Sequence, residues 1–316
     1  MQIKKVIQES IKNQLLERKS DFDEYELTTC ILELYRNPDN TTVSVVNLGN
    51  NSNPSHAIFI NLKKGVLDVI DLNNQLFESS DYKKIDDIIK CFNDKSFNYN
   101  ILKRLDIMIS AGSEHGAEAD YIMYDDGTFS ININAESIYD LGDKQDPLKH
   151  MITDLFVKKV FYDVIRSASL RRVVYHEFSH FYTDIKSNYQ AIKPDLSIKD
   201  EDLLKHNYAN DYNENQARFA GIIADLNLAL SEVASGSTKH VSKNITSYLK
   251  HLKQYQETKA HLSFEKAVNA LESEYNDQTY GWKKLSDKMK TRIQKRVVDI
   301  TMHINEKYDL TNIKID

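Results

Sequence analysis

RRVVYHEFSHFYTD, residues Arg171–Asp184, carries the pattern H-E-x-x-H at His176, Glu177 and His180. Residues four apart lie on one face of an α-helix, about one turn from each other, so both imidazoles can reach the same metal ion. Glu177 projects beside that face, where its carboxylate can take a proton from water at the metal. The stretch therefore predicts a helix with a metal-binding face that is equipped for acid–base chemistry.

Apolar residues surround the motif and predict how this helix packs. Val173 and Val174 precede it, and Phe178 and Phe181 lie within and just after it. The alternative is an exposed helix whose two histidines and glutamate have no function, but such a helix would have solvated flanks. The pattern favours a buried helix with a polar notch.

The composition sets broad limits on function. The chain has 316 residues, 41% of them hydrophobic, which is enough for one large domain or two smaller ones. A net charge of −6 gives no case for nucleic acid or an anionic membrane as partner. No apolar run reaches membrane-spanning length, and residues 1–21 are too polar for a secretory signal. We therefore expect a cytoplasmic protein, or one exported without a cleaved signal peptide.

The first hundred residues predict a small α+β unit. Helical periodicity covers residues 2–18, 24–35 and 82–92. Three β-rich runs separated by turn-forming residues lie between these helices: TTVSVVNL at 41–48, HAIFINL at 56–62 and GVLDVIDL at 65–72.

A β-hairpin is predicted ahead of the metal-binding helix. Asp126 and Gly127 form a strong two-residue turn signal between two alternating runs. The second arm, residues 128–134, places Phe129, Ile131 and Ile133 on one face.

A second helix begins in the sequence NENQA, residues 213–217, and supplies a third ligand. The carboxylate of Glu214 beside two imidazoles leaves a fourth position open, as in catalytic zinc sites. Asp211 and His206 are the other candidates, and a first-turn glutamate that only stabilises the helix dipole is the non-functional alternative. Glu214 ranks first because it alone lies in a helix-start pattern.

The two motifs together resemble those of the gluzincin branch of the zincin metallopeptidases. H-E-x-x-H at 176–180 is followed by N-E-x-x-A at 213–217, and the resemblance covers residues 120–230. It implies that Zn2+ is bound by His176, His180 and Glu214. It also implies an endopeptidase that acts on a protein or peptide substrate, with Glu177 as general base and then proton donor.

The resemblance carries further expectations. It implies a two-lobed, zincin-like α+β fold, and the polar insert before Glu214 is similar to that of metallopeptidases that bacteria deliver into host cells, or that phages encode. In zinc peptidases a sheet-edge strand ahead of the metal helix aligns the substrate by strand addition, and residues 128–134 are expected in this role. An ordinary core hairpin is the alternative. The metzincin pattern is absent, because Lys186 lies where its third histidine would be.

Two supporting roles near the metal have candidates as well. Asp184, one turn after His180, is placed to orient a ligand imidazole or simply to end the helix. Charge that develops on the scissile carbonyl oxygen needs a donor, for which we name Tyr208 and Tyr212. Other candidate donors are Tyr182, His240, His251 and His261.

Two other classes of function remain open. Cys30, His56 and Asp71 occur in the order of a papain-like cysteine hydrolase, although Cys30 lies among apolar residues that favour a core position. The other alternative is an interaction or structural protein that has a zincin-like fold without using a metal.

The remainder of the chain predicts a helical C-terminal lobe. Apolar residues recur at helical spacing between residues 245 and 304, and the last of these helices has a basic outer face, which usually is a solvated surface. We therefore expect three parts: an N-terminal α+β unit (1–100), a zincin-like catalytic core (101–235) and a helical lobe (236–316).

Overall fold

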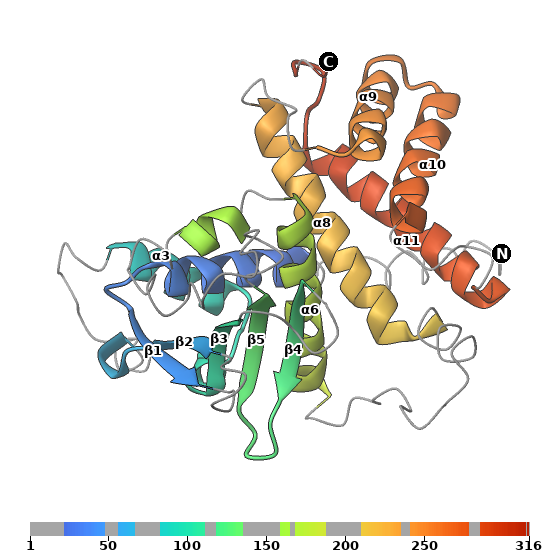
Figure 1. Cartoon of the computed structure of the whole chain (residues 1–316). Helices are drawn as coiled ribbons and strands as arrows, with labels where there is room; N and C mark the ends of the chain where they lie inside the picture. The colour runs from blue at the N-terminus through green and yellow to red at the C-terminus, as the bar shows by residue number, and fades with distance from the viewer. Residues whose placement is uncertain are drawn as a thin grey trace, which may run out of the picture. The chain divides into compact units, whose positions relative to one another are not determined.

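The computed structural model describes residues 22–47, 56–66, 83–110, 118–134, 159–164, 168–187, 210–234, 241–277, 285–313 and 315. They form a mixed α+β protein with one five-stranded sheet and mainly helices elsewhere (Figure 1). The predicted α+β class is confirmed. The chain divides into two compact units, residues 23–182 and residues 183–316 with 1–22.

The sheet of the first unit mixes antiparallel and parallel pairing. Its order is β1-β2-β3-β5-β4, and β3 and β5 are the parallel pair. Because β2 pairs with β3, the predicted boundary at residue 100 falls within a single sheet. The strands are β1 Thr41–Asn47, β2 His56–Leu62, β3 Leu105–Ser110, β4 Ala119–Met123 and β5 Phe129–Asn134.

β5 is an interior strand. It pairs with β3 on one side and β4 on the other, and all six of its residues are buried. The prediction that residues 128–134 form an edge strand open to a peptide is therefore wrong, because a backbone paired on both sides has no groups left to bind another strand. The edges of the described sheet are β1 and β4.

The predicted hairpin around Gly127 is confirmed. β4 and β5 pair in antiparallel register, and the turn is closed by hydrogen bonds from the Gly127 N–H to Tyr124 O and from the Tyr124 N–H to Thr128 O, both 2.9 Å. Gly127 has a φ of 79°, a conformation that disfavours residues with a Cβ. Arg104 donates to the Gly127 carbonyl, and its guanidinium lies 5.0 Å from the ring centre of Phe129. A Cβ at position 127 would meet the end of the Arg104 side chain, which would have to move.

The predicted helices at residues 24–35 and 82–92 and the predicted β-rich runs at 41–48 and 56–62 are confirmed where the structure describes them. Residues 22–36 are helical, α3 spans Lys83–Asp94, and a short 3-10 helix, η2, spans Tyr99–Arg104. In the run 65–72, residues 65 and 66 are helical rather than extended, and the rest lies outside the described residues, as does the predicted helix at 2–18.

α6, Ala168–Lys186, carries the H-E-x-x-H motif and packs on the sheet. The ring of Phe181 meets those of Phe129 on β5 and Tyr121 on β4 edge to face, at centroid distances of 5.5 and 6.4 Å. Offset and edge-to-face aromatic pairs add stability beyond the area they bury. These contacts hold α6 against the hairpin side of the sheet (Figure 1).

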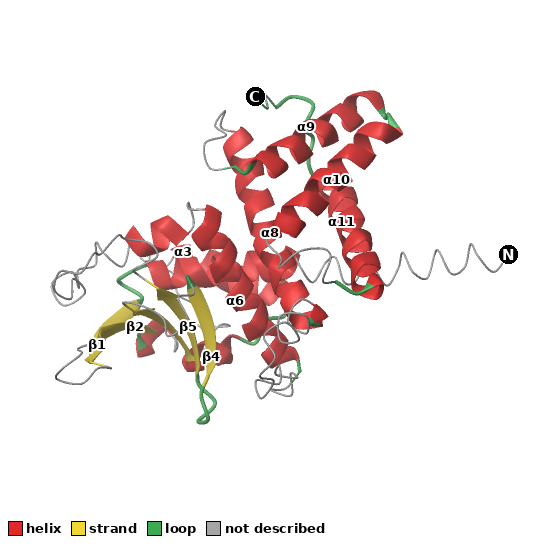
Figure 2. Cartoon of the chain, turned by 45° about the vertical axis from the view of Figure 1, so that its right-hand side comes forward, coloured by secondary structure: helices red, strands yellow, loops and turns green. Residues whose placement is uncertain are grey.

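The second unit is built of helices, whereas all the described strands belong to the first (Figure 2). Ser242 and Ser286 begin α9 and α11, because their hydroxyls accept hydrogen bonds from the first-turn N–H groups of Ile245 and Met289. No helix in the described ranges is long and apolar enough to cross a membrane. The helices are α8 Tyr212–Ala234, α9 Lys243–Thr258, α10 His261–Asp277 and α11 Asp287–Lys307.

Candidate metal centre

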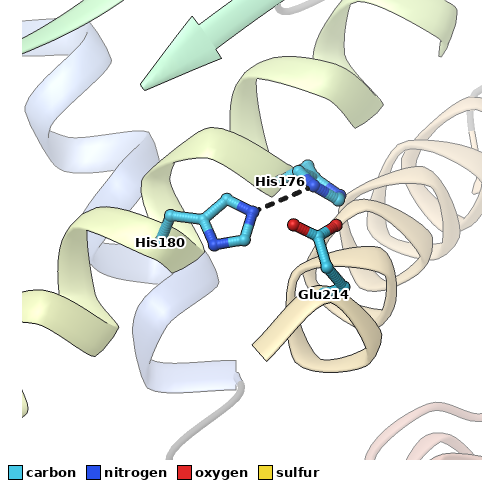
Figure 3. A group of neighbouring side chains, drawn as sticks. All are labelled: His176, His180 and Glu214. Atoms are coloured by element: carbon cyan, nitrogen blue, oxygen red, sulfur yellow. Dashed lines mark hydrogen bonds between the residues drawn. The ribbon is translucent and has the colours of Figure 1, made fainter. Parts of the chain in front are cut away.

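The two histidines of α6 face each other across one helical turn. The Nε2 atoms of His176 and His180 are 3.2 Å apart, and both side chains are half-buried (Figure 3). The spacing suits one N–H···N hydrogen bond between the imidazoles when their tautomers are complementary. It is also close to the spacing for a shared tetrahedral zinc ion, because bonds of about 2.0–2.2 Å separate the ligand atoms by about 3.3–3.6 Å.

The opposite face of α6 is fully buried. Val174, Phe178 and Phe181 have no exposed surface. They lie roughly half a helical turn from His176 and His180, so the apolar stripe and the imidazole pair occupy opposite sides of the helix. The predicted buried helix with a polar face is confirmed.

Two tyrosine–threonine pairs brace α6 against the helix at residues 22–36. The Tyr175 and Tyr182 hydroxyls lie 2.8 and 3.1 Å from those of Thr29 and Thr28. Each threonine hydroxyl donates to a backbone carbonyl in its own helix, so each tyrosine is the donor in its pair. Burial raises the pKa of both tyrosines, which keeps these hydroxyls protonated. The two pairs lie on either side of the His176–His180 turn and fix its orientation.

Glu214 joins the two histidines. Its carboxylate points toward the imidazoles in Figure 3, and one ligand atom from each of His176, His180 and Glu214 lies within 4.8 Å of the others. Two imidazole nitrogens and one carboxylate oxygen are a donor set typical of catalytic zinc. The residues present therefore fit a zinc ion, with the histidine pair already at the required spacing.

Asp211 caps the N-terminus of α8. Its Oδ1 accepts hydrogen bonds from the N–H groups of Asn213 and Glu214, at 2.7 and 3.1 Å. This is the N-cap of α8, which satisfies backbone donors that have no partner within the helix. The cap fixes the first turn of α8, on which Glu214 lies.

The remaining predicted site residues have mixed positions. Glu177 is half-buried beside His176 on α6, and Asp184 is buried one turn after His180. Tyr212 is 45% exposed, and the Arg292 guanidinium lies 4.6 Å from its ring centre. The roles of Asp184 and Tyr212 stay predictions. Tyr208 and His206 lie outside the described residues.

The surroundings of Cys30 do not favour a nucleophile. Its thiol shares a hydrogen bond with Cys91, and this bond and burial raise the pKa of Cys30, whereas the same bond lowers the pKa of Cys91. A nucleophilic cysteine needs a lowered pKa to supply thiolate. The side chain of His56 and the whole of Asp71 lie outside the described residues. In the part of the chain that the structure describes, the surroundings of Cys30 therefore do not support the cysteine-hydrolase alternative.

A buried hydrogen bond to the residue after Glu214 was not predicted from the sequence. Tyr275 on α10 donates a hydrogen bond to the side chain of Asn215, the residue after Glu214. Asn215 has a polar side chain on the interior side of a helix, which is unusual and is the signal that points to a partner. No local pattern identifies Tyr275, because it lies sixty residues further along the chain.

Comparison of the chain with known protein families, curated proteins and solved structures gives no match. The geometry of these side chains is therefore the evidence that bears on function.

Proposed function

We propose that this protein is a zinc-dependent endopeptidase with a zincin-like catalytic unit of the gluzincin type. The observation that carries the proposal is the convergence of His176, His180 and Glu214, whose ligand atoms lie within 4.8 Å of one another. No other group of three or more His, Cys, Asp or Glu side chains with such geometry occurs in the described ranges. The motif spacing and this convergence are independent observations. The spacing is a property of one helix, whereas the convergence depends on how distant segments of the chain fold.

Each residue of the site has a distinct role in this proposal. His176 and His180 hold the ion through their imidazole nitrogens, and Glu214 supplies an oxygen. A bound zinc ion would polarise the scissile carbonyl and lower the pKa of water. Glu177, beside the ligands but not among them, removes a proton from the attacking water and delivers it to the leaving amine. Glu177 is half-buried, so the residue is not enclosed in the apolar core.

A peptide substrate has a candidate docking strand in β4. Ala119–Met123 is an edge of the described sheet, and its Tyr121 contacts Phe181 of the metal-binding helix. An extended peptide that pairs with this edge would gain backbone hydrogen bonds without regard to sequence. β4 thus takes the role that the sequence assigned to residues 128–134.

Zinc content tests the proposal directly. We expect one zinc per chain in the wild-type protein by inductively coupled plasma mass spectrometry, and loss of that zinc in His176→Ala and Glu214→Ala. His261→Ala is the matched control, because this histidine lies exposed on α10. A wild-type protein that takes up no zinc even after reconstitution would contradict the proposal and favour a non-catalytic interaction protein.

Substitution of Asp211 separates its capping role from a ligand role. We expect Asp211→Ala to lower the free energy of unfolding by about 1 kcal/mol, and Asp211→Ser, which restores a capping oxygen, to recover most of it. Both quantities follow from urea denaturation monitored by circular dichroism. Full zinc content in Asp211→Ser would confirm that Asp211 is not the third ligand. Loss of zinc in this variant would mean that Asp211, not Glu214, is the third ligand.

A further inference from the structure

The first turn of α8 is tied to α10 by a chain of buried hydrogen bonds. The Tyr275 hydroxyl donates to Asn215 Oδ1, and Asn215 Nδ2 donates to the backbone carbonyl of Asp211. Tyr275 and Asn215 are both buried. The chain of hydrogen bonds therefore runs from the last turn of α10 to the residue that caps α8, and its members Asp211 and Asn215 flank Glu214 in the sequence.

Arg218 determines the direction of this chain. Its guanidinium hydrogen-bonds to the Tyr275 hydroxyl. Arginine has only donors, so the tyrosine oxygen accepts from Arg218 and its single proton points to Asn215. Burial raises the pKa of Tyr275, which keeps that proton in place. The side-chain amide of Asn215 is held in one orientation as a result.

The two helices are also joined by a ring contact that does not involve this hydroxyl. The rings of Phe219 and Tyr275 lie 4.8 Å apart at an interplanar angle of 31°, and they join α8 to α10 by apolar contact alone. A phenylalanine at position 275 keeps the ring and removes only the hydroxyl. The function of the hydroxyl can thus be separated from the function of the ring.

We propose that Tyr275 is a positioning residue for the carboxylate of Glu214, acting through Asn215 and the capped first turn of α8. The inference rests on the proposed zinc site, in which Glu214 is the third ligand. Groups that orient a metal ligand typically change metal affinity about 10–100-fold when they are removed. The hydroxyl lies two hydrogen bonds from the ligand's turn, so we expect an effect of about 10-fold.

The test is a double-mutant cycle on zinc affinity in the full-length protein. The dissociation constant for zinc is measured by competition with a chelating dye for wild type, Tyr275→Phe, Glu214→Ala and the double variant. We expect Tyr275→Phe to weaken zinc binding about 10-fold in the wild-type background and to have no further effect in the Glu214→Ala background. Asn215→Ala is a second variant that breaks the same chain, and we expect the same pattern from it.

Tyr248→Phe is the matched control. Tyr248 is a fully buried tyrosine of the same unit, on α9, and takes no part in the chain to α8. We expect its loss of a hydroxyl to leave zinc affinity unchanged. Circular dichroism and thermal unfolding of every variant show whether the fold is intact.

The outcomes distinguish this inference from the proposed function. If the wild-type protein binds no zinc, both the proposed function and the positioning role of Tyr275 are overturned. A second outcome is that the wild-type protein binds zinc and that Glu214→Ala weakens this binding. If Tyr275→Phe and Asn215→Ala are then folded and bind zinc as tightly as the wild-type protein, only the positioning role is overturned. An equal loss of affinity with and without Glu214 would also overturn it, because Tyr275 would then act by another route.

Discussion

Glu177→Gln is expected to retain zinc and to hydrolyse peptides about 10²–10⁴-fold more slowly than the wild-type protein. Glutamine has nearly the same size and shape as glutamate, so the half-buried position beside His176 is preserved. It cannot accept a proton at neutral pH, so the attacking water loses its base. The measurement is kcat/KM on a quenched fluorescent peptide selected from a library with the wild-type enzyme, together with zinc content.

The control for this prediction is Glu257→Gln. Glu257 lies exposed on α9, where its contact is a 3.8 Å ion pair with Lys253 one turn earlier. The Glu257→Gln substitution makes the same chemical change away from the site, so we expect turnover at the wild-type rate. Wild-type turnover in Glu177→Gln would contradict a role for Glu177 as general base, even if the zinc site itself proved correct.

Phe181→Ala is expected to lower the free energy of unfolding of the first unit by about 3–5 kcal/mol. The side chain has no exposed surface, and its ring contacts Phe129, Tyr121 and Phe178 at centroid distances of 5.5 to 6.4 Å. Alanine leaves a cavity between α6 and the sheet that rigid neighbours cannot fill. Urea denaturation followed by circular dichroism at 222 nm measures the loss.

Tyr162→Ala is the control for this packing prediction. Tyr162 is an aromatic residue of the same unit that is 45% exposed, and substitutions at such positions typically change stability by about 0.5 kcal/mol or less. A similarly small change in Phe181→Ala would mean that α6 does not depend on its aromatic contacts with β4 and β5.

Local features of the fold were predictable because periodicity reports which face of an element is buried. The two sides of α6 were separable in the sequence, since Phe178 and Phe181 are about half a turn from the histidines. The hairpin was predictable because Gly127 permits the positive φ that its turn requires. The same logic does not reveal strand partners. Alternation in residues 129–134 is compatible with an edge or an interior strand, and pairing with β3 depends on contacts far along the chain.

The candidate site divides in the same way. His176, Glu177 and His180 are neighbours on one helix, so the sequence alone determined that their side chains share a face or lie next to it. The helix-start pattern ranked Glu214 first as third ligand, and Asp211 and His206 stayed open as alternatives. Only the structure assigned Asp211 to the cap of α8 and placed Glu214 in a group with both histidines.

The sequence by itself thus determined the helix that carries the H-E-x-x-H motif, its buried and polar faces, the α+β class and the hairpin, because each depends on residue spacings of two to seven. Tertiary structure alone decided that β5 is interior, that β4 is an edge of the described sheet, and that Tyr275 reaches Asn215, the residue after the candidate ligand. These features depend on which distant segments pack together. Which segments pack together depends on burial and hydrogen bonding over the whole chain, and this cannot be predicted from local residue spacing.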